Sequence, residues 1–217
     1  MELFDLPHTA RVQRVIPKNA FDAYTTSKQK KLFVDKISRI TWLHKLSPDT
    51  VNLEAKDVKE IQIFKVELKE KEDVQSLLDV IDKAIPYHII FIVEFGKRVY
   101  LCTSTKHPHP VNLDNAVLDW TFKSNWFAPE DNRYLLHLKK NLDTIYSDFC
   151  VQLSAKSSMA NHSLQDLVQY KKQESLLTTE IERLKKSIKN CKQYKIKVEL
   201  NLQLKQKMNE LKRLSAT

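Results

Sequence analysis

Hydrophobic residues follow two different patterns along this chain. Up to residue 153, short apolar runs alternate with amphipathic stretches, whereas beyond residue 163 apolar side chains recur at steps of three, four and seven residues. The first pattern is typical of strands mixed with helices, and the second of helices that pack along one seam. A short stretch of polar and small residues separates them. We therefore predict an α+β body in residues 1–153, a linker in residues 154–163 and a helical tail in residues 164–217.

The body is predicted to contain a mostly antiparallel sheet with flanking helices. The nearly all-apolar run 89–95 predicts a central strand, and Gly96 predicts a turn into an antiparallel neighbour. Runs rich in β-branched residues predict the other strands. The predicted strands are residues 50–53, 61–68, 89–95, 99–103 and 117–122. Apolar residues at helical spacing predict helices at residues 28–40, 74–85 and 135–153.

The apolar residues of the tail form two seams. The first consists of Leu167, Tyr170, Leu177, Ile181, Leu184 and Ile188, and the second of Leu200, Leu204, Met208 and Leu211. Residues 190–197 interrupt the register, so either one helix stutters there or two helices fold back as an antiparallel hairpin. The hairpin is favoured because Asn190 can end a helix and the seams have similar lengths. Short isolated helices are marginal in water, so we expect self-association or a protein partner through residues 164–217.

Positive charge is concentrated in the tail. Residues 163–217 contain 13 Lys and Arg against 6 Asp and Glu, a net charge of +7 out of +9 for the 217-residue chain. Six lysines cluster at the break between the seams: Lys185, Lys186, Lys189, Lys192, Lys195 and Lys197. Lysines in this arrangement can contact nucleic-acid phosphates without reading sequence. A coiled coil with solvated lysines explains the same pattern, and both interpretations stay open.

A single glycine, Gly96, excludes several classes of enzyme. Loops that hold nucleotide phosphates need glycines so that the backbone can approach the ligand. We therefore exclude ATPases, GTPases, kinases and nicotinamide-dependent enzymes, and we expect no nucleotide cofactor. No apolar run reaches the roughly 18 residues of a membrane helix, so no membrane partner is expected. Three scattered cysteines and the absence of a secretion signal predict a cytoplasmic location.

One charged pattern is a candidate for chemistry. Pro48-Asp49 and Glu67-Leu68-Lys69 match the sparse PD…ExK pattern of a large nuclease superfamily. In that chemistry Asp49 and Glu67 would hold Mg²⁺ beside the scissile phosphate, and Lys69 would orient or activate the attacking water. Magnesium is expected only under this hypothesis. The same short strings are common in turns and at strand ends, so an ordinary structural role stays open.

Several strings together resemble a known bacterial and archaeal family, catalogued as domain of unknown function 4391. They are residues 15–18 (VIPK), 40–42 (ITW), 45–53 (KLSPDTVNL), 60–69 (EIQIFKVELK), 81–86 (IDKAIP) and 192–201 (KQYKIKVELN). The resemblance covers nearly the whole chain and implies a place among proteins encoded beside helicases and DNA methyltransferases of restriction-like, anti-phage loci. It supplies no catalytic residues.

These observations give three hypotheses about function. The first is a non-catalytic accessory or scaffold subunit of a DNA-modification or anti-phage defence assembly. Such a subunit would bind a protein partner, with or without DNA, through its basic tail. The second is a Mg²⁺-dependent nuclease that uses Asp49, Glu67 and Lys69. The third is a coiled-coil adaptor without DNA contact.

Overall fold

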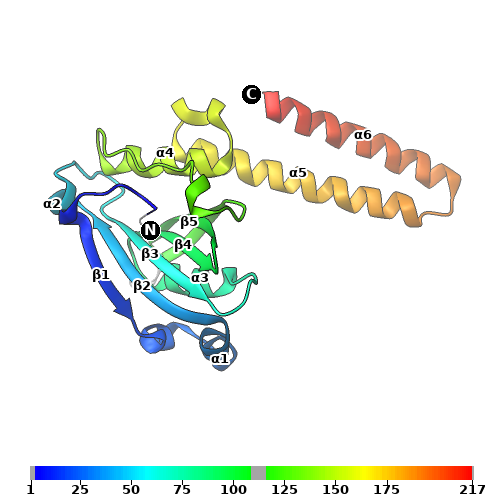
Figure 1. The fold of residues 1–217 in the computed structure, drawn as a ribbon. Helices are drawn as coiled ribbons and strands as arrows, with labels where there is room; N and C mark the ends of the chain where they lie inside the picture. Colours follow the sequence, from blue (N-terminus) through cyan, green and yellow to red (C-terminus); the bar gives the residue numbers. More distant parts are fainter. Residues whose placement is uncertain (1–2, 109–115, 217) are drawn as a thin grey trace. The chain divides into compact units, whose positions relative to one another are not determined.

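The computed structural model describes residues 3–108 and 116–216 and divides into two compact units (Figure 1). The first unit, Met1–Ala160, contains the body, and the second, Asn161–Thr217, contains the tail. The strands are β1 (Arg11–Ile16), β2 (Ile37–Leu46), β3 (Ile61–Leu68), β4 (His88–Phe95), β5 (Arg98–Pro108) and β6 (Ala116–Lys123). The α-helices are α1 (Ser27–Lys36), α2 (Pro48–Val51), α3 (Gln75–Ala84), α4 (Leu142–Ser154), α5 (Leu164–Asn190) and α6 (Tyr194–Ala216). The 3₁₀ helices are η1 (His8–Ala10), η2 (Lys18–Tyr24), η3 (Pro129–Asp131) and η4 (Ser157–Asn161).

The body is built on one six-stranded sheet in the order β1-β2-β3-β4-β5-β6. Neighbouring strands are antiparallel except for β3 and β4, which are parallel and joined through α3. The sequence prediction of an α+β fold with a mostly antiparallel sheet is therefore confirmed. The apolar run 89–95 forms most of β4, which lies between β3 and β5 as predicted for a central strand.

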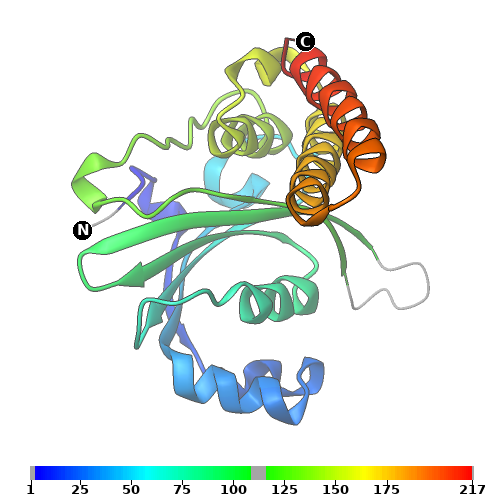
Figure 2. The ribbon, with the colours of Figure 1, turned by 90° about the vertical axis from the view of Figure 1, so that its right-hand side faces the viewer.

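Helices cover both faces of the sheet (Figure 2). On one face, α3 packs its buried residues Leu77, Leu78 and Ile81 into the main core, where Phe64 and Phe91 come from neighbouring strands. On the other face, Tyr146 of α4 reaches the sheet, where its hydroxyl lies 3.0 Å from Thr103 Oγ1 and donates to the carbonyl oxygen of Ser104 at 2.7 Å. Burial on both faces explains why β4 is apolar throughout.

Three predicted elements of the body are corrected. The helix predicted at residues 28–40 ends at Lys36, and Ile37 and Ile40 belong to β2. An irregularity between Ile37 and Arg39 lets Ile37 pair opposite Leu68 and Ile40 opposite Val66. A β-bulge of this kind puts residues three apart on the same face, which imitates helical spacing.

The other two corrections come from helix caps. The strand predicted at residues 50–53 is instead the short helix α2, because Ser47 and Thr50 form a capping box and Pro48 fits the first helical position. The helix predicted at residues 135–153 begins only at Leu142, because Asn141 caps it: the Thr144 N–H donates to Asn141 Oδ1 at 2.8 Å.

The tail is a helical hairpin, so the hairpin was the right alternative and the stuttering single helix the wrong one. Helix α5 begins after a capping box formed by Ser163 and Asp166, and only residues 191–193 separate it from α6. Leu177, Ile181 and Leu184 of the predicted first seam are buried. Met208, predicted in the second seam, is 52% exposed. Its neighbour Lys207 instead lies 3.4 Å from Glu180 of α5.

Candidate functional site

The hairpin turn carries all of the tail's excess positive charge. Residues 183–198, which we call the tip, contain seven Lys and Arg and no Asp or Glu. The remainder of residues 163–217 contains six of each kind and is neutral. The chain therefore alternates charges along the hairpin's shaft but places only cations where α5 ends and α6 begins.

The six predicted lysines are all brought together at the tip, and all are exposed. Lys185, Lys186 and Lys189 lie on the last two turns of α5, Lys192 lies in the turn, and Lys195 and Lys197 lie on the first turn of α6. Lys185 pairs with Glu182 at 2.7 Å on the helix surface. Such exposed pairs contribute little and exchange readily with other anions. Within the described residues, the other five lysines form no ion pair, so their charge remains available to a polyanion.

In the shaft, which is the part of residues 163–217 outside the tip, lysines pair with glutamates. Lys171 lies 2.6 Å from Glu174, and Lys207 lies 3.0 Å from Glu210 and 3.4 Å from Glu180. These pairs connect turns within a helix or join α5 to α6. The contrast between this neutral shaft and the basic tip, where Lys185 is the one lysine of the six with an ion pair among the described residues, is the main electrostatic feature of the tail.

The structure does not bring Asp49 and Glu67 together. Asp49 lies in α2, directly after the end of β2 where Leu46 pairs with Ile61 at the start of β3. Glu67 lies at the opposite end of β3 and pairs with Arg39. Six strand residues separate the two ends, a distance of about 20 Å at ~3.3 Å per residue. Two carboxylates that share one ion must both lie within about 2–3 Å of it.

In the PD…ExK pattern, Glu67 and Lys69 instead contact other residues of the body. Glu67 Oε1 lies 2.9 Å from Lys65 Nζ, and Glu67 Oε2 lies 3.6 Å from Arg39 Nε. The Lys69 ammonium donates to the carbonyl oxygen of Val34 at 2.8 Å, near the end of α1. No group of three or more His, Cys, Asp or Glu residues in the described chain is arranged to hold a metal. The separation of Asp49 from Glu67 shows that these two carboxylates do not share one ion in this fold.

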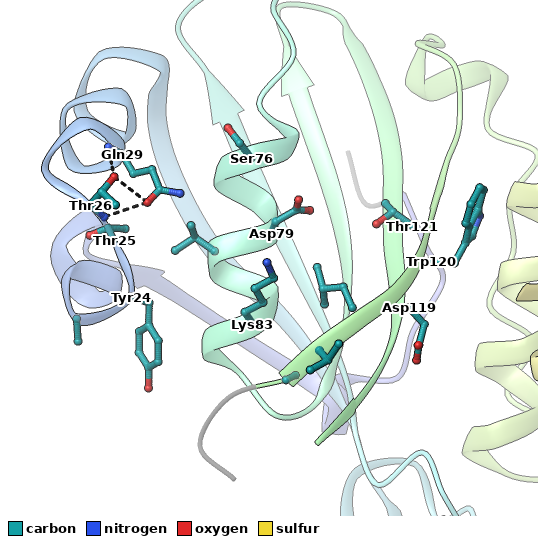
Figure 3. Close-up of a pocket in the computed structure, with 15 residues that line it drawn as sticks. Tyr24, Thr25, Thr26, Gln29, Ser76, Asp79, Lys83, Asp119, Trp120 and Thr121 are labelled. Atoms are coloured by element: carbon teal, nitrogen blue, oxygen red, sulfur yellow. Dashed lines mark hydrogen bonds between the residues drawn. The ribbon is translucent and has the colours of Figure 1, made fainter. Parts of the chain in front are cut away.

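A cleft in the body was not predicted from the sequence (Figure 3). It has a volume of about 960 Å³ and three walls. They are residues 23–26 and Gln29, from the end of η2 to the start of α1, then Ser76, Asp79, Val80 and Lys83 of α3, and residues 116–121 of β6. Because these segments are far apart in the sequence, no local motif marks the cleft.

A buried ion pair lies in the same unit and was also missed. Lys106 of β5 and Asp82 of α3 have side chains that are each 1% exposed. Burial raises the pKa of Asp82 and lowers the pKa of Lys106, and the charge of each partner opposes the shift of the other. Lys106 lies beyond the predicted strand 99–103, and a lysine in an apparent loop gives no signal of burial.

Together the fold and these features define a two-part α+β protein with a basic helical hairpin. No helix among the described residues is long and apolar enough to cross a membrane. The chain belongs to the family described as Domain of unknown function (DUF4391), whose model matches residues 4–211. No curated protein and no solved structure matches the chain.

Proposed function

We propose that this protein is a non-catalytic binding subunit that contacts nucleic-acid phosphates through the tip, without reading sequence. The observation that carries the proposal is the placement of the tail's entire net positive charge at the hairpin turn. A cluster of lysines free of carboxylates releases counterions when it meets a polyanion, which favours binding. An accessory role in a DNA-modification or anti-phage defence assembly is consistent with such a subunit and is part of the proposal.

The test is binding of the full-length protein to a labelled random-sequence DNA duplex, measured by fluorescence anisotropy over a series of salt concentrations. The wild-type affinity should fall steeply with salt, with a slope that reports about 0.9 per phosphate contact. Replacing Lys185, Lys186, Lys189 and Lys192 with glutamine should weaken binding to every duplex and flatten the slope. No measurable binding of the wild type at low salt would overturn the proposal.

A matched control separates the tip from net charge. Replacing four exposed lysines of the body with glutamine changes the net charge by the same amount and leaves the tip intact; the four are Lys28, Lys31, Lys139 and Lys140. This variant should keep both the affinity and the salt slope. Equal losses in the two variants would show that total charge governs binding, and the tip would then not be the site.

A second candidate function, docking of a protein partner on α6, is favoured by a separate observation. Tyr194, Val198 and Leu202 are spaced by four residues, so they form one stripe, and they are 83%, 43% and 65% exposed. Lys195 and Lys205 lie along the same stripe at helical spacings. Because the tail has a net charge of +7, an acidic partner is favoured over a second copy. The fitting partner is an amphipathic helix with acidic residues beside its apolar face.

Docking on α6 is tested with a labelled synthetic helix that has leucine on one face and glutamate on both flanks. Replacing Val198 and Leu202 with glutamine should abolish its binding and leave DNA binding unchanged. Replacing Leu176, which is 71% exposed on α5, with glutamine is the control and should have no effect. Equal loss in the two variants, or binding of the wild type only to anionic lipid vesicles, would count against a helical partner.

A further inference from the structure

Strand β6 ends the sheet and is paired on one side only, with β5, within the described part of the chain. The unpaired side exposes backbone groups that can receive another strand. The Ser124 N–H donates to the carbonyl oxygen of Leu101 at 2.9 Å and so points toward β5. In an antiparallel ladder the direction alternates between residues, which places the N–H of Thr121 on the unpaired side.

The cleft lies against this edge strand. Six consecutive residues, 116–121, line it. Leu118 pairs with Lys106 and Trp120 with Thr105, so the strand bulges here and its residues do not alternate strictly between the two faces. Figure 3 shows the side chains of Asp119 and Trp120 pointing away from α3, so these two residues border the cleft with their main chain.

The other walls of the cleft come from α3 and from residues 23–26 and Gln29. Ser76, Asp79, Val80 and Lys83 follow the i, i+3, i+4, i+7 spacing and so present one face of α3. Tyr24 and Gln29 border the opposite side. Six strand residues span about 20 Å, which matches five or six residues of an added strand. A groove between a helix and a sheet edge is the geometry of peptide binding by strand addition.

We propose that this cleft binds an extended peptide segment of a partner protein, which adds as a seventh strand beside β6. Val80 and Leu118 offer an apolar contact for one side chain of the peptide. Lys83 is exposed and forms no ion pair among the described residues, so it selects an acidic residue nearby. The proposal does not depend on the tip.

The experiment uses the full-length protein and a heptapeptide selected against it from a displayed random library. Hydrogen exchange should show slower exchange of the amides of residues 116–121 when the synthetic peptide is added. A peptide with the same sequence and N-methylated alternate amides should lose at least tenfold in affinity, because strand addition needs its N–H groups. Lys83→Gln should weaken binding of the acidic peptides that the library yields. The variant with glutamine at Lys185, Lys186, Lys189 and Lys192 should bind these peptides as the wild type does.

A variant of the strand tests the same contact from the protein side. Thr121→Pro removes one N–H on the unpaired side and leaves the backbone hydrogen bonds between β6 and β5. It should therefore severely lower the affinity for the peptide. Thr121→Ser keeps the N–H and is the control. Should the proline variant fail to fold, the N-methylated peptide gives the same information. Three results would each overturn the proposal. They are selected peptides that slow exchange only in the tail, a library that yields no enriched peptide, and dimers that protect residues 116–121 without peptide.

Discussion

Lys106 Nζ lies 2.8 Å from Asp82 Oδ1 in the core and joins the end of α3 to β5. The same ammonium donates to the carbonyl oxygens of Asp82 and Ile85, at 2.8 and 2.7 Å. These carbonyls belong to the last turn of α3 and to its C-cap residue, where the helix leaves carbonyl groups without a partner in the helix. The lysine therefore acts as a cap from a neighbouring strand, and the carboxylate neutralises it where water has little access.

Removing the lysine alone should destabilise the protein more than removing both charges. We expect Lys106→Met to lower the free energy of unfolding by about 3–5 kcal/mol, because Asp82 is left buried without a countercharge. The double variant Lys106→Met/Asp82→Leu should recover a large part of that loss. Urea denaturation of the wild type, both single variants and the double variant measures the coupling. Additive losses would show that the two side chains do not stabilise each other.

Asp143 fastens a loop of the body to α4. Its carboxylate accepts backbone N–H groups of Lys56, Asp57 and Val58 at 2.9, 2.9 and 3.0 Å. Partial burial acts to raise the pKa of Asp143, but these hydrogen bonds outweigh it and hold the pKa below its usual value. The carboxylate thus stabilises the fold above the unfolded pKa of about 3.9 and loses that contribution as the pH falls through the folded value.

We expect Asp143→Ala to cost about 2–3 kcal/mol at neutral pH, because three donors lose a charged acceptor. Asp148→Ala, on the exposed side of the same helix, is the control and should cost less than about 0.5 kcal/mol. Thermal unfolding followed by circular dichroism measures both. A loss of similar size in the two variants would assign the effect to the helix and not to the loop.

Magnesium should not stabilise this protein. An ion that binds only the native state raises the melting temperature, and the separation of Asp49 from Glu67 leaves no shared site. We expect equal melting temperatures with and without Mg²⁺ in the wild type, in Asp49→Ala and in Glu67→Ala. A Mg²⁺-dependent rise in the wild type that disappears in either variant would restore the nuclease hypothesis.

Periodicity and composition were sufficient for the class of fold and for β4, because each depends on a continuous apolar pattern. For the tail they left two alternatives, of which the favoured hairpin is confirmed. They were not sufficient for β1, whose residues Arg11–Ile16 are mostly exposed at the sheet edge and carry little apolar signal. The bulge in β2 gave Ile37 and Ile40 a helical spacing. In both cases pairing with a neighbouring strand decides the structure, and the local sequence does not record it.

The same distinction applies to the candidate sites. The tip could be predicted because its lysines are close together in the sequence and a helical hairpin keeps them together in space. The cleft could not, because three segments between residues 23 and 121 meet only after folding. The PD…ExK pattern failed for the converse reason: α2 and the end of β3 are close in sequence but lie at opposite ends of an antiparallel pair.

His88 should make the protein sensitive to mild acid. Its ring packs on Tyr146 with centroids 4.4 Å apart, and burial, assisted by the Lys106 charge and opposed by Asp143, lowers the pKa of His88 to about 4 from its usual 6.5. Between these values the unfolded chain binds more protons than the native protein, so stability falls as the pH falls. From about pH 7 to about pH 5 the loss should be roughly 2 kcal/mol.

The variant His88→Phe keeps a ring against Tyr146 but cannot titrate. Over that pH range its free energy of unfolding should therefore fall by roughly 2 kcal/mol less than that of the wild type. Urea denaturation of the wild type and of His88→Phe at both pH values tests this. If His88→Phe loses as much stability as the wild type between the two pH values, protonation of another group causes the acid sensitivity.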